Sequence, residues 1–171
     1  MLLPASTNLI LIGMPGAGKS TIGMLLAKHA NLGFLDTDLL LQSREGRSLQ
    51  QIVDQDGYLG LRAAEERLIL SLNCTNQVIA TGGSVVYSES AMQHLQNLGR
   101  IIFLHLPLAE LLPRLVDLDT RGLVRRPGQS IRDLYAERLP LYRRYADFTI
   151  DCQGLERQQV AQIICDCLKI C

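Results

Sequence analysis

The feature that most constrains this chain is a glycine-rich turn between an apolar run and a helical pattern. Residues Gly13–Thr21 match the pattern G-x-x-x-x-G-K-[S/T] in full. The apolar run Leu9–Ile12 precedes the turn, and apolar residues at helical spacing follow it over Ile22–Ala30. This order predicts a strand, a phosphate-binding turn and a helix, which together form a P-loop. A glycine-rich turn that contains a lysine by chance is the alternative, and the full match in this context disfavours it.

Each residue type in this turn suits the binding of a nucleoside triphosphate. Glycine lets backbone N–H groups face a phosphate, and the helix that begins near Gly18 directs its positive end at the same anion. Lys19 can reach the β- and γ-phosphates, and the Ser20 hydroxyl can ligate Mg²⁺. We therefore expect ATP to be bound by Gly16, Ala17, Gly18, Lys19, Ser20 and Thr21.

Length and charge narrow the class of protein. The chain has 171 residues, of which 47% are hydrophobic, enough for one domain whose sheet is covered on both faces. Its formal net charge is zero, which disfavours a nucleic-acid coat protein or a binder of anionic membranes. Leu9–Ile12 is too short for a signal peptide or a membrane span. We expect a single domain over residues 1–171, located in the cytoplasm and monomeric, with neither nucleic acid nor membrane as a partner.

The cysteines are also consistent with the expected cytoplasmic location. There are five, an odd number, at Cys74, Cys152, Cys165, Cys167 and Cys171. Without a secretory signal they predict free thiols in a reducing compartment. The last three lack the C-x-x-C spacing and the neighbouring histidine of a typical metal site, so we expect them to pack on the last helix rather than to bind a metal.

Short apolar runs separated by helical patterns indicate the fold. The predicted strands are Leu9–Ile12, Leu32–Leu35, Val78–Ala80, Arg100–Leu106 and Phe148–Ile150. The runs are nearly continuous rather than alternating, which is typical of a parallel sheet with helices on both faces. The predicted fold class is α/β, a three-layer α/β/α arrangement around a five-stranded parallel sheet. Ligands of such sheets bind at the carboxyl ends of the strands.

Several residues predict where helices begin or break. Ser48 and Gln51 fit a capping box, and Gly57 interrupts the helical pattern that follows them. Pro140 lies inside another helical pattern, where we expect a kink or a break. Such a break could direct the nearby Arg138 at a binding site.

A polar, arginine-rich segment over approximately 117–129 interrupts the alternation of strands and helices. It contains glycine and proline and is long for a connection within a compact domain. We therefore predict a lid loop.

Two aspartates follow the second predicted strand, in the sequence Asp36-Thr37-Asp38. One can hold a water of Mg²⁺, and the other can orient a substrate hydroxyl and take its proton. N-capping of the next helix is an alternative for Asp38, and it is compatible with a role in the site. The strand Val78–Ala80 does not end in the aspartate of a Walker-B motif, so Asp36 is the candidate second contact of Mg²⁺.

Two further features have both a structural and a functional interpretation. Gly82 and Gly83 end the third predicted strand, where they indicate either a tight turn or a close approach of backbone to a small ligand. Arg62 lies three residues before Glu65, so it forms either a surface ion pair on a helix or part of a site.

Taken with the P-loop, four segments carry a resemblance to a known family. They are Asp36-Thr37-Asp38, Gly57-x-x-x-Leu61-Arg62-x-x-Glu65, Gly82-Gly83 and Arg138-x-Pro140-Leu141-Tyr142. Many NTPases share the P-loop, but this order and spacing resembles the shikimate kinase family over nearly the whole chain. The resemblance implies a small P-loop kinase of the nucleoside monophosphate kinase-like type. Such an enzyme uses ATP and Mg²⁺ to phosphorylate the 3-hydroxyl of shikimate.

The resemblance also implies roles by position. Ser20 and Asp36 match the Mg²⁺ contacts, and Asp38 matches the residue that activates the acceptor hydroxyl. Planar arginines suit a carboxylate, and Arg62 and Arg138 match the family's clamp on this group. The implied substrate-binding set is Asp38, Arg62, Gly82, Gly83 and Arg138.

Two more arginines match family positions near ATP. Arg114 resembles the arginine beside the adenine. Arg121 lies seven residues after Arg114 and 17 before Arg138, which suits the lid arginine better than Arg126 does. Arg121 could close over the γ-phosphate and stabilise the charge in transfer. The implied catalytic set is Asp38, Lys19 and Arg121.

Two departures leave the acceptor open. Ser84 stands where the family commonly has a third glycine, and Gly122 replaces the usual proline of the lid. A related kinase of another hydroxy-acid, such as gluconate, is the alternative to a shikimate kinase. A silent nucleotide-binding module is a second alternative, which the intact Lys19, Ser20 and Asp38 disfavour.

Overall fold

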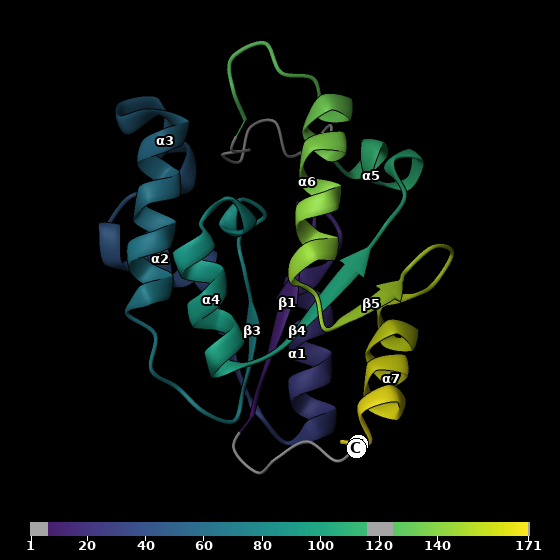
Figure 1. Ribbon diagram of the computed structural model, residues 1–171. Coiled ribbons are helices and arrows are strands. Elements are labelled where there is room, and N and C mark those ends of the chain that lie inside the picture. Colours follow the sequence, from purple (N-terminus) through teal and green to yellow (C-terminus); the bar gives the residue numbers. More distant parts are fainter. Residues whose placement is uncertain (1–6, 116–124, 171) are drawn as a thin grey trace.

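The computed structural model describes residues 7–115 and 125–170. Five parallel strands form one sheet in the order β2-β3-β1-β4-β5 (Figure 1). The strands are β1 (Asn8–Ile12), β2 (Gly33–Asp36), β3 (Gln77–Ala80), β4 (Gly99–His105) and β5 (Phe148–Asp151). Each predicted strand end lies within one residue of the observed one. The predicted α/β fold with a five-stranded parallel sheet is confirmed.

Helices connect the strands and pack on the sheet. They are α1 (Lys19–Ala30), α2 (Thr37–Glu45), α3 (Leu49–Leu70), α4 (Glu89–Leu98), α5 (Leu108–Leu115), α6 (Ile131–Tyr145) and α7 (Arg157–Leu168). A short 3₁₀ helix, η1 (Val85–Tyr87), lies between β3 and α4. Helices α1 and α7 pack against each other, and α3 packs against α4 (Figure 1). None of the helices in residues 7–115 and 125–170 is long and apolar enough to cross a membrane.

The central strand β1 is completely buried, and it begins with a polar residue. The Asn8 amide donates to the carbonyl oxygens of Cys74 at 2.7 Å and Leu98 at 3.0 Å, and its Oδ1 accepts from the Gln77 N–H at 2.9 Å. A buried amide is tolerated when its donors and acceptor are paired in this way. Asn8 therefore ties the beginning of β1 to the segments that lead into β3 and β4.

The helix-boundary predictions had mixed outcomes. The capping box of Ser48 and Gln51 is present, and α3 has non-helical backbone at Gly57 (φ 74°, ψ 174°), as predicted. Of the kink or break predicted at Pro140, the break is wrong, because α6 continues through the proline as one helix. A second capping box, of Ser130 and Asp133, secures the beginning of α6. Buried side chains before and after the proline also hold this helix in place.

The expectation of free thiols holds for three of the described cysteines. Cys74, Cys152 and Cys167 are free, but Cys165 is disulfide-bonded. The odd count therefore did not exclude a disulfide. Burial raises the pKa of the Cys152 thiol to about 12, so this sulfur stays protonated.

Candidate active site

The P-loop connects β1 to α1 and holds its lysine inside. Gly18 has positive φ (93°), and α1 begins at the next residue. The Lys19 ammonium donates to the carbonyl oxygens of Gly13 at 2.8 Å and Met14 at 2.9 Å. Burial lowers the pKa of Lys19 to about 8, although Asp38 opposes the shift. The loop thus keeps a cation and a helix N-terminus together, as a triphosphate requires.

Asp36 joins the P-loop helix to the beginning of α2. Its Oδ2 accepts from the Ser20 hydroxyl at 2.6 Å, and its Oδ1 accepts from the backbone N–H groups of Asp38 at 3.0 Å and Leu39 at 3.2 Å. Asp36 is therefore the N-cap of α2, and the expectation of a cap at Asp38 is wrong. With its backbone bonded to Asp36, Asp38 presents its carboxylate from the first turn of α2.

Two carboxylates meet at the end of β3. A Cβ atom on Gly82 would lie 2.4 Å from Glu65 Oε1 and 2.8 Å from Asp38 Oδ1, so any larger residue would have to displace the two carboxylates. Burial raises the pKa of Asp38 to about 6, against the effect of Lys19. Burial, followed by the charge of Asp38, raises the pKa of Glu65 to about 7. Both groups therefore titrate close to neutral pH.

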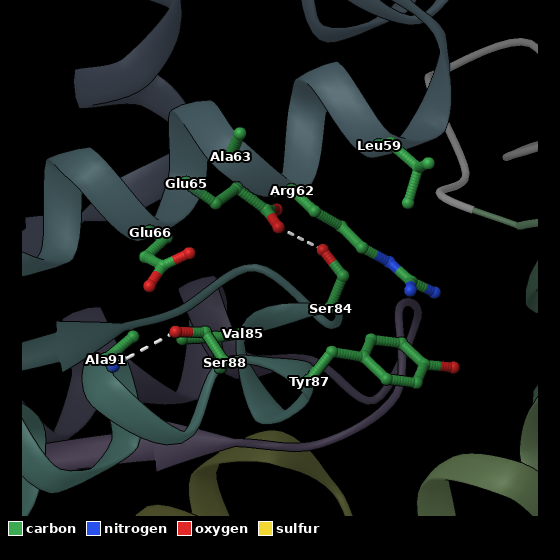
Figure 2. A pocket seen from close by; sticks show the side chains of 10 residues that line it. All are labelled: Leu59, Arg62, Ala63, Glu65, Glu66, Ser84, Val85, Tyr87, Ser88 and Ala91. Atoms are coloured by element: carbon green, nitrogen blue, oxygen red, sulfur yellow. Dashed lines mark hydrogen bonds between the residues drawn. The ribbon is translucent and has the colours of Figure 1, made fainter.

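Glu65 is bonded to the residue that departs from the family pattern. The buried Ser84 hydroxyl donates to Glu65 Oε2, and this hydrogen bond counteracts part of the rise in the pKa of Glu65 (Figure 2). The two residues line a cavity of about 240 Å³ that also includes Arg62 and Tyr87. The extra side chain of Ser84 is thus directed at Glu65.

The two predicted clamp arginines both contact Tyr87. The Arg62 guanidinium carbon is 3.6 Å from the centre of the Tyr87 ring, and the Arg138 guanidinium carbon is 5.2 Å from it. Two buried atoms of Arg62, Nε and Nη2, have no hydrogen-bond partner within residues 7–115 and 125–170. Because buried donors are normally paired, this edge of Arg62 is available for a ligand.

Gly83 gives Arg138 room beside the P-loop. A Cβ atom on Gly83 would lie 2.7 Å from Pro15 Cδ and 3.0 Å from Arg138 Nη1. The carbonyl of Gly83 accepts from the Tyr142 hydroxyl at 2.6 Å. The segment that follows β3 therefore lies against the P-loop and α6. The predicted approach of the Gly82-Gly83 backbone to a small ligand stays a prediction.

Two further arginines were predicted for the nucleotide site, Arg114 and Arg121. Arg114 donates weakly to the carbonyl of Gly16 (3.4 Å) and lines a cavity of about 250 Å³ with Ala17 and Arg157. Arg121 lies outside the described residues, as does most of the predicted lid. Arg126, in the described part of the predicted lid, forms an ion pair with Glu137.

Sequence reasoning missed Tyr87 and gave Glu65 no place among the site residues. Tyr87 belongs to a three-residue 3₁₀ helix, which is too short to show a hydrophobic period. The signal that could have found Glu65 was its position three residues after Arg62, on the buried face of α3.

Comparisons with known proteins agree with this geometry. A family model described as shikimate kinase matches residues 15–169. A shikimate kinase of Pseudomonas aeruginosa (strain LESB58) is 39% identical over 165 residues, which cover 95% of this chain and 96% of the relative. The chain belongs to the shikimate kinase family. The resemblance predicted from the motifs is thus confirmed.

Solved structures of the family superpose on the chain over nearly its full length. A shikimate kinase from Acinetobacter baumannii in complex with shikimate has a TM-score of 0.89 at 30% identity, covering 97% of this chain and 94% of that one. A shikimate kinase from Aquifex aeolicus has a TM-score of 0.81 at 32% identity, and the match covers 95% of this chain and 96% of that one. The family's α/β fold and its P-loop are therefore both present here.

Proposed function

We propose that this chain transfers the γ-phosphoryl group of ATP to the 3-hydroxyl of shikimate, giving shikimate 3-phosphate and ADP. The observation that carries the proposal is the unpartnered edge of Arg62. Nε and Nη2 lie side by side on a guanidinium, and they pair with both oxygens of one carboxylate. The P-loop alone suits many acceptors, whereas a free arginine edge close to Arg138 suits a hydroxy-acid.

Asp38 is proposed to orient the acceptor and take its proton. The 3-oxygen forms the new bond to the γ-phosphorus, the bond from that phosphorus to the β,γ-bridging oxygen breaks, and the hydroxyl proton passes to Asp38. A pKa of about 6 lets this carboxylate be ionised at neutral pH and still accept a proton during transfer. Burial beside Lys19 and Glu65 therefore tunes Asp38 for this role.

Lys19 and the predicted lid are proposed to bind the triphosphate. In the structure Lys19 is bonded to the carbonyls of Gly13 and Met14, so its ammonium is already positioned within the loop. Its proposed role is to bind the β- and γ-phosphates, with the backbone of residues 16–21. Arg121, on the predicted lid, is proposed to close over the γ-phosphate, and Arg114 to lie beside the adenine.

Ser20 and Asp36 are proposed to hold Mg²⁺. Their hydroxyl and carboxylate oxygens lie 2.6 Å apart beside the loop, and such hard oxygen ligands fit this ion. Mg²⁺ commonly uses one or two protein ligands with phosphates and waters, so this pair suffices although the described residues contain no larger cluster of ligands. When bound, the ion supplies positive charge to the β- and γ-phosphates.

The alternatives are a gluconate-type kinase and a silent module, and one assay separates them. ADP release is measured with ATP, Mg²⁺ and a panel of acceptors that includes shikimate and gluconate. We expect turnover with shikimate only. Turnover with gluconate alone would overturn the proposal, and ADP release that no acceptor stimulates would favour the silent module. Family membership and the Arg62 edge support shikimate. A monomeric state and a cytoplasmic location complete the proposal.

A further inference from the structure

Tyr87 contacts both arginines of the proposed acceptor site. Figure 2 shows its ring facing the Arg62 guanidinium, beside Ser84 and Glu65. The ring comes from η1, whereas Arg62 comes from α3 and Arg138 from α6. We propose that Tyr87 is a positioning residue, which holds the Arg62 edge toward the acceptor carboxylate. The inference rests on the proposed function, because it names what that edge binds.

An aromatic face suits this task better than an acidic partner does. A cation over a ring is held by the negative charge of the ring face and does not need to direct its N–H groups at an acceptor. Nε and Nη2 of Arg62 accordingly have no hydrogen-bond partner among the described residues. A carboxylate partner would occupy the same edge and compete with the substrate. The separation of 3.6 Å is that of direct face contact.

The orientation of the Tyr87 ring is set by two hydrogen bonds at its hydroxyl. The hydroxyl donates to Glu137 Oε1 at 2.6 Å and accepts from Arg138 Nε at 3.3 Å. Both partners lie on α6, so η1 is held against this helix. Glu137 and Arg138 thus fix the ring, and the ring in turn supports Arg62.

Glu137 also connects Tyr87 to residues 126–129, the last part of the predicted lid. Its Oε2 accepts from Gln129 Nε2 at 2.9 Å and pairs with Arg126. Gln129 in turn accepts from the backbone N–H of Arg126 at 3.2 Å. The same carboxylate therefore holds Tyr87 with one oxygen and residues 126–129 with the other.

The test compares Tyr87→Leu, which removes the ring, with Tyr87→Phe, which keeps it. Steady-state kinetics are measured with shikimate and with its methyl ester, which lacks the anionic group. We expect Tyr87→Leu to lower kcat/KM for shikimate by about tenfold, mainly through KM, and to change kcat/KM for the ester by less than about twofold. Tyr87→Phe should retain most of the difference in kcat/KM between shikimate and its methyl ester.

Two controls separate positioning from a general structural effect. Tyr135→Leu makes the same change at a hydrogen-bonded tyrosine of α6, whose hydroxyl lies 3.2 Å from His105 Nε2, outside the site. Tyr135→Leu should leave the ratio of kcat/KM for shikimate to kcat/KM for the methyl ester unchanged. In an Arg62→Ala background, Tyr87→Leu should have little further effect on shikimate, since its partner is gone. Equal losses for both acceptors, or full additivity with Arg62→Ala, would overturn the inference.

A spectroscopic readout keeps the inference testable if wild type does not phosphorylate shikimate. The Nε–H resonance of Arg62, assigned by its loss in Arg62→Lys, should be shifted by the Tyr87 ring and exchange slowly with water. Tyr87→Leu should abolish both properties, while Tyr87→Phe keeps the shift. An Arg62 resonance that is unchanged in Tyr87→Leu would refute the positioning role, whatever the acceptor is.

Discussion

The nucleotide end and the acceptor end of this site are built in different ways. The nucleotide end is one continuous stretch, Gly13–Thr21, whose backbone groups and one lysine are proposed to bind the triphosphate. The acceptor end consists of side chains from separate elements: Asp38 of α2, Arg62 and Glu65 of α3, Tyr87 of η1 and Arg138 of α6. A backbone cradle binds any similar phosphate chain, whereas a set of side chains can select one acceptor. Specificity therefore depends on the acceptor end.

Burial has opposite effects on the charged groups of the two ends. It lowers the pKa of Lys19 to about 8, and it raises those of Asp38 and Glu65 to about 6 and 7. All three shifts favour the neutral form. Keeping these buried groups charged therefore costs stability, and ligands that pair with them would offset that cost.

The largest expected effect is that of Asp38→Asn, which should impair the acceptor end and leave the nucleotide end intact. Asp38→Asn keeps the shape of the side chain but removes the proton acceptor. We expect kcat to fall by about a thousandfold, while the affinity for ATP, measured by calorimetry, stays near that of wild type. If kcat stays within about tenfold, a difference of ~1.4 kcal/mol, Asp38 does not activate the acceptor.

Arg62→Lys tests whether the acceptor end needs a planar edge or only a positive charge. Lysine keeps the charge but cannot form the two parallel hydrogen bonds. We expect KM for shikimate to rise by about ten- to a hundredfold, with KM for ATP unchanged, because a charge-assisted hydrogen bond contributes about 1.5–3 kcal/mol. An unchanged KM for shikimate would mean that the carboxylate binds elsewhere.

Glu65→Gln tests the effect of burial on the stability of the acceptor end. Because the pKa of Glu65 is raised in the folded state, its contribution to stability is fully present below its unfolded pKa of about 4.5. It is lost as the pH rises through about 7. Glu65→Gln should therefore flatten the fall of unfolding free energy between pH 5 and 8, measured by urea denaturation. The pKa of Asp38 is also raised in the folded state, so part of the fall in unfolding free energy should remain in Glu65→Gln.

The smallest expected effect concerns the departure at Ser84. Ser84→Gly removes a hydrogen bond to the ionised form of Glu65, so the pKa of Glu65 should rise further. NMR titration of the Glu65 carboxyl carbon would measure the shift. We expect KM for shikimate to change by less than about threefold, since Ser84 points at Glu65 (Figure 2). A lowered pKa would contradict the role given to this hydrogen bond.

The same contrast explains what could be predicted from the sequence. The P-loop and the buried strands depend on neighbouring residues, and both were predicted within one residue. The contact of Tyr87 with Arg62 joins two elements, and no local pattern encodes it. The same is true of the bond from Ser84 to Glu65, 19 residues apart. The break predicted at Pro140 did not occur, because the unfavourable helix propensity of proline was outweighed by the packing and capping of α6.

Asn8 has a consequence for the order in which the molecule assembles. Its hydrogen-bond partners lie 66, 69 and 90 residues further along the chain. During synthesis, β1 and the loop after it emerge early, but the amide at the start of β1 cannot form all its native hydrogen bonds until Leu98 has left the ribosome. The first functional segment to be made is therefore fixed in place only after more than half of the chain has been synthesised.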